Sequence, residues 1–385
     1  NTYTLANHVE NLIFGGTGAF AGTGNALANV ITGGAGNDAL RGRGGVDTLN
    51  GGAGLDTADY TLAAAGVTAR VDLQRATNDG DGATDTYSSI ENLIGSNFND
   101  TLIGDAGANV LMGGIGTDTL LGFGGNDILM GGSGGGNNQL QGGTGDDWYI
   151  MDAFDTAVEF AGEGVDTVEA RIGSYTLGNN IENLLYTGPG KFVGNGNALD
   201  NVLTGGALND VLRGKGGNDT INGGLGVDEV QLRGSKAQYT ITAEAHGWRI
   251  VDSVAGRDGS TLVNSVEVLR FMTGNTTTVL TYGPPPAPLE ATDKAGTPFS
   301  PQVSPLIEDD VFVLPALVDG EPLALPDVAA IRLADEPLVL PGTGDTPLFL
   351  ALEARFAPAG GWMAVADDHG RLLGDADLRS DDWMT

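Results

Sequence analysis

The chain has 385 residues, among them 64 glycines and no cysteine, and its 50 acidic and 18 basic side chains give a formal net charge of −32. The lack of cysteine excludes a disulfide framework and zinc sites built on thiolates. A charge of this sign would repel nucleic-acid phosphates, so we expect no DNA or RNA partner. No apolar run of about 18 residues is present, and we therefore predict no transmembrane segment.

The composition changes near residue 283. Residues 1–282 contain 55 of the 64 glycines, whereas residues 283–385 contain 14 of the 15 prolines. The net charge is −19 before this boundary and −13 after it. We predict a structured region rich in Gly, Asp and Asn, followed by a Pro-rich acidic tail at 283–385. The chain opens within a repeat and without methionine, so we expect a C-terminal piece of a longer or processed protein.

A nine-residue unit, G-G-x-G-x-D-x-U-x with U apolar, dominates the structured region. In the first block, 1–60, the units read GGAGNDALR, GRGGVDTLN and GGAGLDTAD from residue 33. The frame returns in a second block, 95–150, and in a third, 196–234. Residues 3–56 also match residues 175–228 without a gap. The protein is therefore predicted to be a serial array of modules.

The unit itself predicts a fold. Its six glycine-rich residues can adopt the positive φ of a tight turn, and three residues remain for a short strand with one inward apolar side chain. One unit cannot bury that side chain alone, but two units form one coil and stacked coils bury a continuous column. We predict an all-β fold, a parallel β-roll or β-helix solenoid.

The aspartates of such a roll stack as well. Turns on one edge lie about 4.8 Å apart, where carboxylates repel one another strongly without a counter-charge. Calcium resolves this repulsion because it takes six to eight oxygen ligands, including backbone carbonyls that glycine-rich turns leave free. Magnesium demands stricter geometry and fits such a turn less well.

At these residues the chain resembles the repeats-in-toxin (RTX) proteins, whose nonapeptide repeats form a calcium-loaded parallel β-roll. The resemblance implies roughly six to eight Ca²⁺ ions, each held between a turn and the next turn on the same edge. The implied bridges are Asp38–Asp56, Asp100–Asp118, Asp127–Asp147 and Asp210–Asp228, while Asp47 and Asp219 face turns carrying Asn29 and Asn201. Asn109 and Asn138 also replace aspartate, and weaker sites are expected at all four asparagines. Leu208 replaces a glycine, so its turn departs from the pattern.

The remaining segments complete the predicted organisation. Residues 61–94 and 151–195 are β-rich connecting segments that continue the solenoid with irregular coils, and residues 235–282 form a β cap. The sequence NDGDGATD at residues 78–85 lacks the closing glutamate and the full spacing of an EF-hand, and it predicts a turn.

The tail and the resemblance together predict export. RTX proteins leave Gram-negative bacteria through type I secretion machinery that reads an uncleaved C-terminal signal, and residues 381–385 (DDWMT) are similar to such signals. A disordered acidic tail is the alternative. We expect a secreted or cell-surface protein whose roll folds on extracellular calcium, with a structural or adhesive role of the adhesin or surface-layer type. Partners would include calcium and the secretion machinery, with cell-surface binding or self-association as a further option.

No catalytic signature is found, so the chain is predicted not to be an enzyme. His8, His246 and His369 lie far apart and outside an HExxH motif. The G-x-S-x-G match at 131–135 falls inside a repeat, without the strand–turn–helix context of a hydrolase. The alternative function is the non-catalytic secretion and folding region of a secreted RTX enzyme (protease, lipase or epimerase) or of a toxin, with the active domain upstream.

Overall fold

The computed structural model describes residues 1–132, 136–152, 154–244, 247–273 and 276–281, together with four two-residue strands further on. The chain divides into two compact units, 1–288 and 289–385. In the second unit β32 (Ala291–Thr292) pairs with β33 (Pro298–Phe299), and β34 (Val311–Phe312) pairs with β35 (Leu352–Glu353). The rest of the tail, including the predicted secretion signal, lies outside the described residues. The boundaries of the seven predicted segments stay a prediction.

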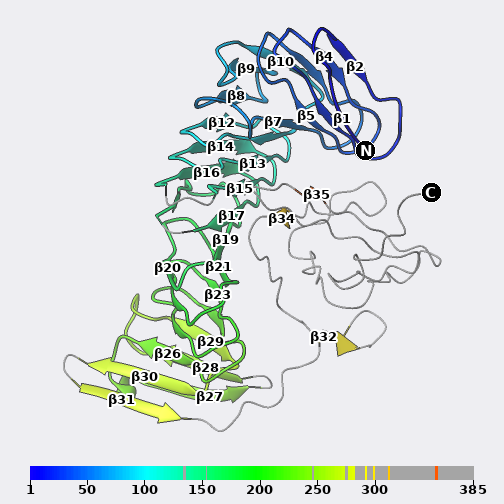
Figure 1. Cartoon of the computed structure of the whole chain (residues 1–385). Helices are drawn as coiled ribbons and strands as arrows, with labels where there is room; N and C mark the ends of the chain where they lie inside the picture. The colour runs from blue at the N-terminus through cyan, green and yellow to red at the C-terminus, as the bar shows by residue number, and fades with distance from the viewer. Residues whose placement is uncertain are drawn as a thin grey trace. The chain divides into compact units, whose positions relative to one another are not determined.

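The first unit is a stack of coils whose short strands pair in parallel with strands one coil away (Figure 1). One sheet runs through the whole stack and contains 15 strands. In sheet order these are β1 (Thr2–Thr4), β3 (Ala21–Thr23), β5 (Ala39–Arg41), β7 (Thr57–Asp59), β11 (Asn92–Ile94), β13 (Val110–Met112), β15 (Ile128–Met130), β17 (Trp148–Met151), β19 (Thr167–Ala170), β21 (Asn183–Tyr186), β23 (Val202–Thr204), β25 (Thr220–Asn222), β29 (Ser260–Asn264), β28 (Gly247–Asp252) and β27 (Tyr239–Glu244).

Two shorter sheets form the second wall of the coils, one after the other along the chain. The first contains β18 (Thr156–Ala157), β16 (Gln139–Thr144), β14 (Thr119–Gly124), β12 (Thr101–Ile103), β8 (Thr68–Arg70), β9 (Arg75–Asn78), β10 (Asp85–Ser88), β6 (Thr48–Asn50), β4 (Val30–Thr32) and β2 (Asn11–Ile13). The second contains β20 (Ser174–Thr176), β22 (Val193–Asn195), β24 (Val211–Arg213), β26 (Glu229–Leu232), β30 (Val268–Thr273) and β31 (Thr276–Thr281).

The core is a column of apolar side chains, with one inward residue on each strand of the regular repeats. Leu93, Leu111 and Leu129 are aligned by the strand register, and each is fully buried. Burial of each such leucine stabilises the fold by about 1.5–3 kcal/mol. One coil alone would not gain this free energy, because its leucine would stay exposed without a neighbouring coil. The predicted all-β parallel roll, with its apolar position pointing inward, is confirmed.

The internal duplication is visible in the packing. The rings of Phe14 and Phe20 stack with centroids 4.5 Å apart, and Tyr186 and Phe192, at the matching positions, stack at 4.3 Å. Phe20 fills space beside the strand residue Gly22, where an added Cβ would lie 2.7 Å from its ring. The two modules are therefore built on the same local contacts as well as on similar sequences.

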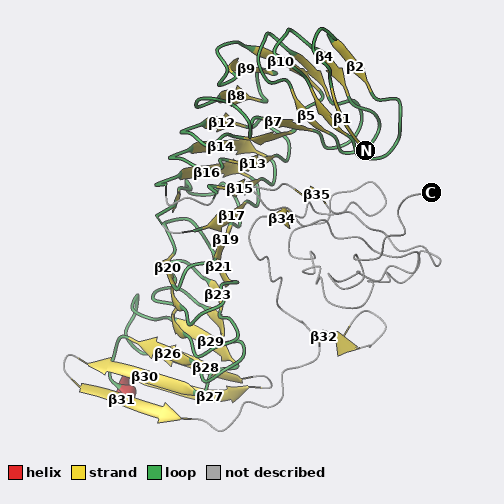
Figure 2. Cartoon of the chain, viewed as in Figure 1, coloured by secondary structure: helices red, strands yellow, loops and turns green. Residues whose placement is uncertain are grey.

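Antiparallel pairing occurs where the nine-residue frame is absent. Strand β9 pairs antiparallel with β8 and β10 between the first two blocks. After the third block, β27, β28 and β29 form an antiparallel sheet, and β30 pairs antiparallel with β31. A 3₁₀ turn, Lys236–Gln238, precedes β27 (Figure 2). No helix among the described residues has the length and apolar character needed to cross a membrane.

Candidate calcium sites in the turns of the roll

The aspartates of the repeats form ladders along the edges of the roll. Each precedes a strand, and its backbone N–H donates to the side chain of the equivalent residue one coil further on. The Asp38 N–H, for example, donates to Asp56 Oδ1 at 2.8 Å. The structure likewise brings together the three other predicted pairs, Asp100–Asp118 (2.8 Å), Asp127–Asp147 (2.7 Å) and Asp210–Asp228 (2.8 Å).

The four asparagines stand in the same ladders. The N–H groups of Asn29, Asn109 and Asn201 donate to the carboxylates of Asp47, Asp127 and Asp219, respectively. The Asn138 N–H donates to Asp155 in the same way, at 3.4 Å. The Asn138 side-chain oxygen also accepts the N–H of Asp118 at 2.7 Å, and its side-chain nitrogen donates to Asp155.

Further acidic residues that the sequence analysis did not select continue the ladders. They are Asp85 beyond Asp47, Glu91 beyond Asp56, Asp155 beyond Asn138, Asp166 beyond Asp147, Glu182 beyond Asp166 and Glu267 beyond Asp228. A sequence signal existed for some of them. Asp166 ends GEGVD, which fits the repeat frame, and Glu91 and Glu182 occupy the same place in two IENL segments. The predicted turn at 79–85 is also present, with Asp79 Oδ1 accepting two backbone N–H groups.

In one class of turn, which we call open, the second carboxylate oxygen is buried and accepts no hydrogen bond within the described part of the chain. The residue four positions before the aspartate has a positive φ, such as +110° at Gly52 and +79° at Phe123. That backbone conformation favours glycine, and it turns the local N–H away from the carboxylate. The open turns are those of Asp47, Asp56, Asp118, Asp127, Asp147, Asp166, Asp219 and Asp228.

In the other class, which we call closed, the residue four positions earlier donates its N–H to the side-chain oxygen. The Gly34 N–H donates to Asp38 Oδ2 at 2.5 Å, and the Asn25 N–H donates to Asn29 Oδ1 at 2.7 Å. These earlier residues do not have positive φ. The closed turns are those of Asn29, Asp38, Asp100, Asn109, Asn201 and Asp210.

The first glycine of each unit leaves room where polar oxygens converge. A Cβ at Gly122 would lie 2.0 Å from Asp127 Oδ2 and 2.6 Å from the Gly142 carbonyl oxygen of the next coil. A carboxylate and a carbonyl from successive coils thus approach the same space. Buried carboxylate oxygens without donors, beside free carbonyls, are the ligand set that calcium takes, so the residues present fit this ion.

Burial sets the electrostatics of the open turns. It raises the pKa of Asp127 to about 9, with the carboxylate of Asp147 adding to the effect, although the hydrogen bond from Asn109 opposes it. Burial also raises the pKa of six other open-turn aspartates to about 7, namely Asp47, Asp56, Asp118, Asp147, Asp219 and Asp228.

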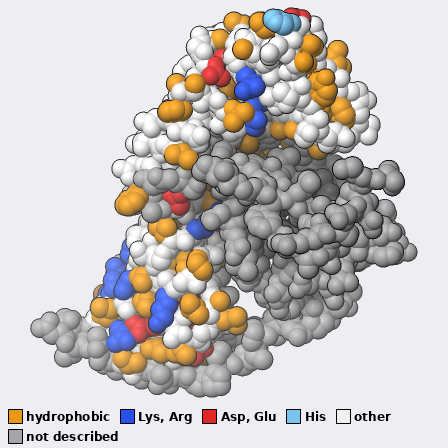
Figure 3. Space-filling model, in the orientation of Figure 1, with side chains coloured by type: hydrophobic (Ala, Val, Ile, Leu, Met, Phe, Trp, Pro, Cys, Tyr) orange, Lys and Arg blue, Asp and Glu red, His pale blue; other side chains and the backbone are white. Residues whose placement is uncertain are grey.

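Basic side chains do not compensate these aspartates. Within the described residues, the ion pairs of Arg side chains involve none of the open-turn carboxylates. Figure 3 accordingly shows few acidic side chains on the visible face of the roll, because the ladder aspartates are buried. The roll therefore holds its negative charge inside, where a cation would be needed to balance it.

Comparison with known families supports the nature of these turns. A family model described as the RTX calcium-binding nonapeptide repeat (4 copies) matches residues 23–58, 85–120, 107–135, 133–148 and 195–230. The chain contains RTX repeats. These matched segments include all the closed turns and every open turn except that of Asp166.

Two individual proteins show limited likeness to the chain. An endo-1,3-1,4-beta-glycanase, ExsH, of Rhizobium meliloti is 47% identical over 68 residues, which cover 17% of this chain and 14% of that protein. An extracellular lipase, LipA, of Serratia marcescens has 18% identity and a TM-score of 0.12, over 64% of this chain and 38% of the lipase. The chain thus spans a small part of each protein, and neither likeness assigns catalysis to it.

The prediction that the chain is not an enzyme stays a prediction. His246, His369 and the centre of the G-x-S-x-G match at 131–135 lie outside the described residues. His8 lies on the surface of the first coil, and its side chain is exposed.

Proposed function

We propose that the chain is the calcium-binding region of a secreted or cell-surface protein of a Gram-negative bacterium, and that its roll folds when extracellular calcium enters the open turns. The observation that carries this proposal is the set of buried Oδ2 atoms without hydrogen-bond donors, such as those of Asp118 and Asp219. They occur inside segments that match calcium-binding RTX repeats.

The proposed coupling follows from the cost of burying charge. Without ions, the folded roll would place carboxylates in a desolvated column, which opposes folding. Extracellular modules bind calcium with dissociation constants of roughly 0.1–1 mM, which suits a chain that is unfolded in the cytosol and folded outside. Binding only to the folded state at about 100 times the dissociation constant stabilises it by about 2.7 kcal/mol per site.

The proposed ligands are the predicted aspartates, with the open-turn oxygens as the principal donors. The turns of Asp38, Asp100 and Asp210 are closed. These three residues would therefore contribute chiefly to ions bound in the open turn of the coil that follows each of them. Asn29, Asn109 and Asn201 have their amide oxygens occupied by N–H groups, in keeping with the weaker sites expected there. The predicted number of six to eight ions is close to the number of open turns.

A structural or adhesive role, of the adhesin or surface-layer type, is the function that we favour. The support is the long modular array, in which the module at the start of the chain recurs with the same aromatic stacking. Export through type I secretion machinery is part of this proposal, since folding driven by calcium would keep the chain threadable before it leaves the cell.

The second candidate is the secretion and folding region of a secreted RTX enzyme or toxin. The glycanase match favours it, because a protein named as an enzyme shares a 68-residue stretch with this chain. The reading frame upstream of residue 1 separates the two candidates. A catalytic signature there would support the second, and further repeats would support the first.

Circular dichroism of the full chain, in chelator and then in about 10 mM calcium, tests the proposed coupling. We expect a spectrum of a largely unordered chain in chelator and a β-rich spectrum in calcium. Magnesium at the same concentration should produce a much smaller change because it fits carbonyl-rich turns poorly. Identical spectra in chelator and calcium would contradict the proposal.

Two alanine variants control this experiment. Asp118 presents a bare, buried oxygen, whereas Asp105 is partly exposed and its Oδ1 already accepts the Gly107 N–H. Asp118→Ala should shift the calcium midpoint upward and remove about 3 kcal/mol of calcium-dependent stability. Asp105→Ala should leave the midpoint close to that of the parent chain. Equal effects would show that the ladder position does not matter.

A further inference from the structure

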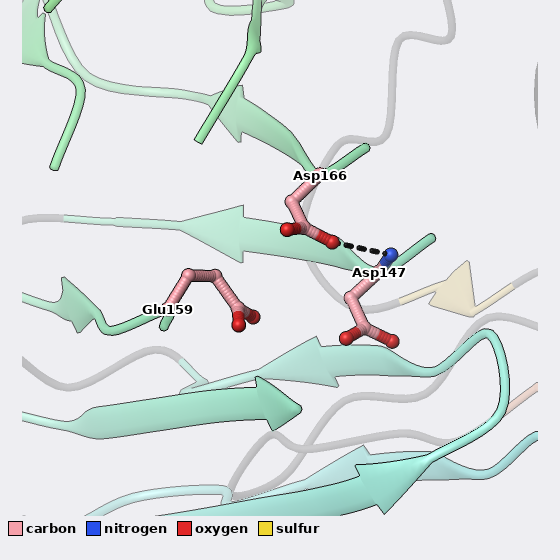
Figure 4. Close-up of side chains that lie close together, drawn as sticks. All are labelled: Asp147, Glu159 and Asp166. Carbon is pink, nitrogen blue, oxygen red and sulfur yellow. Dashed lines mark hydrogen bonds between the residues drawn. The ribbon is translucent and has the colours of Figure 1, made fainter. Parts of the chain in front are cut away.

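Three buried carboxylates converge at the point where the second repeat block ends. Asp147 precedes β17, Asp166 precedes β19, and Glu159 lies two residues after β18. One oxygen of each lies within 4.8 Å of the other two (Figure 4). Glu159 and Asp166 fall outside the segments that match the RTX repeat. Asp147 and Asp166 follow the repeat frame, so Glu159 is the member that the repeat pattern does not account for.

Each of the three side chains is more than nine-tenths buried and presents a bare oxygen. The exposed fractions are 1% for Asp147, 5% for Glu159 and 1% for Asp166. Their Oδ2, Oε2 and Oδ2 atoms, respectively, accept no hydrogen bond from the described residues. None of the ion pairs in that part of the chain involves them. Three like charges are thus desolvated together without a protein counter-charge.

The other oxygens are held in place by the roll. Asp166 Oδ1 accepts the Asp147 N–H at 2.9 Å, and Asp147 Oδ1 accepts the Asp127 N–H at 2.7 Å. Glu159 Oε1 accepts the hydroxyl proton of the buried Tyr149 side chain. That hydroxyl in turn accepts the Gly142 N–H at 2.6 Å. These contacts fix one oxygen of each carboxylate and leave the other directed into the cluster.

Glu159 occupies a place that belongs to glycine in the regular coils. Strand β16 pairs with β18 with Leu140 opposite Ala157, and the same register two residues on brings Glu159 level with Gly142. In the preceding coil pair, the carbonyl of Gly142 approaches the Asp127 carboxylate. Here the glutamate adds a charged oxygen where the repeats supply a neutral carbonyl.

We propose that Asp147, Glu159 and Asp166 form a three-carboxylate calcium site, separate in composition from the nonapeptide turn sites. Two oxygens bound to one calcium at 2.3–2.6 Å lie at most about 5 Å apart, a limit that this cluster satisfies. Three carboxylates carry more charge than the aspartate and carbonyls of an ordinary turn, so this site fills at lower calcium concentration. The identity of the ion rests on the proposed function of the roll.

Removal of the Glu159 charge tests the site in the full chain. Glu159→Gln keeps an oxygen that can accept the Tyr149 hydroxyl proton but removes one of the three charges. Isothermal titration with calcium should then show one ion fewer, or the affinity of its tightest site reduced by about tenfold or more. Glu244→Gln is the control, because Glu244 is exposed, pairs with Arg249 and is not in the cluster.

Thermal unfolding gives a second readout that a merely structural role would not produce. In chelator, where the parent chain is largely unordered, Glu159→Gln should show the same β content by circular dichroism or more, because it removes a buried like charge. As calcium is raised, the unfolding temperature of Glu159→Gln should increase less than that of the parent chain. If Glu159→Gln does not fold, Glu159→Asp retracts the carboxylate by one methylene and should show the same loss of affinity.

Terbium(III) in place of calcium locates the effect. Trp148 directly follows Asp147, so terbium bound at the cluster should emit on tryptophan excitation, and Glu159→Gln should lose part of that emission. A Glu159→Gln chain with unchanged ion number, affinity and emission would overturn the three-carboxylate site while leaving the proposed function intact. A parent chain that binds no calcium would overturn both.

Discussion

The open and closed turns share one nine-residue frame and differ in what lies before them in the stack. On the same edge of the roll, the coil that precedes each closed turn has no repeat turn. Phe20 occupies the position that precedes Asp38 in the stack, and Phe192 occupies the position that precedes Asp210. Each open turn follows another ladder turn, as Asp56 follows Asp38 and Asp228 follows Asp210. The first turn of a stack satisfies its carboxylate or amide internally, and each later turn leaves an oxygen bare. An ion site is therefore a property of two successive turns.

This difference explains how the chain tolerates its charge. Closed turns complete their hydrogen bonds within the protein, so they can form before an ion arrives. Open turns bury a carboxylate oxygen without a donor, which costs free energy until a cation binds. We infer that the closed turns of Asp38, Asp100 and Asp210 are the least calcium-dependent positions from which stacking proceeds.

The largest expected effect is that of pH on the calcium-free chain. Burial raises the pKa of open-turn aspartates such as Asp47 and Asp219 from 3.8 to about 7 in the folded state. A raised folded-state pKa means that protonation stabilises the fold, fully below about pH 4 and progressively less as the pH rises through about 7. In chelator, β content measured by circular dichroism should therefore increase when the pH is lowered from about 8 to about 5.

Calcium should reverse this dependence, because ions and protons compete for the same oxygens. The calcium midpoint should fall as the pH rises across that interval. A calcium-free chain with the same β content at both ends of the interval would show that the open-turn carboxylates are not desolvated, and the distinction between the two classes would then lose its physical basis.

A smaller effect is expected from glycine at equivalent positions of one open and one closed turn. Lys215, in the turn of Asp219, has φ +76°, a conformation that costs a non-glycine residue about 1 kcal/mol. Asn197, in the turn of Asn201, donates from its side chain to the carbonyls of Gly178 and Ile181 at 2.7 Å. Lys215→Gly should leave stability unchanged or raise it slightly, since greater unfolded-state entropy offsets the relief of strain.

Asn197→Gly should instead destabilise the calcium-bound chain by about 1–3 kcal/mol, because it removes the side-chain donor to the Gly178 carbonyl and one of the two donors to the Ile181 carbonyl. Thermal unfolding in calcium compares the two variants directly. Equal losses from both substitutions would mean that the two turn classes have the same backbone requirements, contrary to the structure.

Much of the fold follows from local sequence. The nine-residue period gives the strand, the inward apolar residue and the pairing of every second unit, so the juxtaposition of Asp38 and Asp56 was predictable. These features depend on a unit and its neighbour in register.

The turn class, the position of Glu159 and the β8–β10 hairpin depend on which residues an irregular coil places beside a regular one. A glycine two positions before the ladder residue does not decide the turn class, because the turns containing Gly36 and Gly107 are closed. The carboxylate of Glu159 reaches Asp147 and Asp166 from a loop after β18, and the nine-residue period does not predict the length of that loop. The hairpin at β8–β10 likewise replaces coils through antiparallel pairing that only tertiary contacts select.

A crystal structure of the chain grown in calcium, with ions located from anomalous scattering, would test the central claim most directly. We predict one ion peak beside each bare oxygen, at Asp47, Asp56, Asp118, Asp127, Asp147, Asp166, Asp219 and Asp228, with neighbouring turns sharing ions where their oxygens meet. The side-chain oxygens that remain bonded to N–H groups at Asn29 and Asn201 should lack a peak of their own. Peaks at these closed turns, with none at the open ones, would contradict the account.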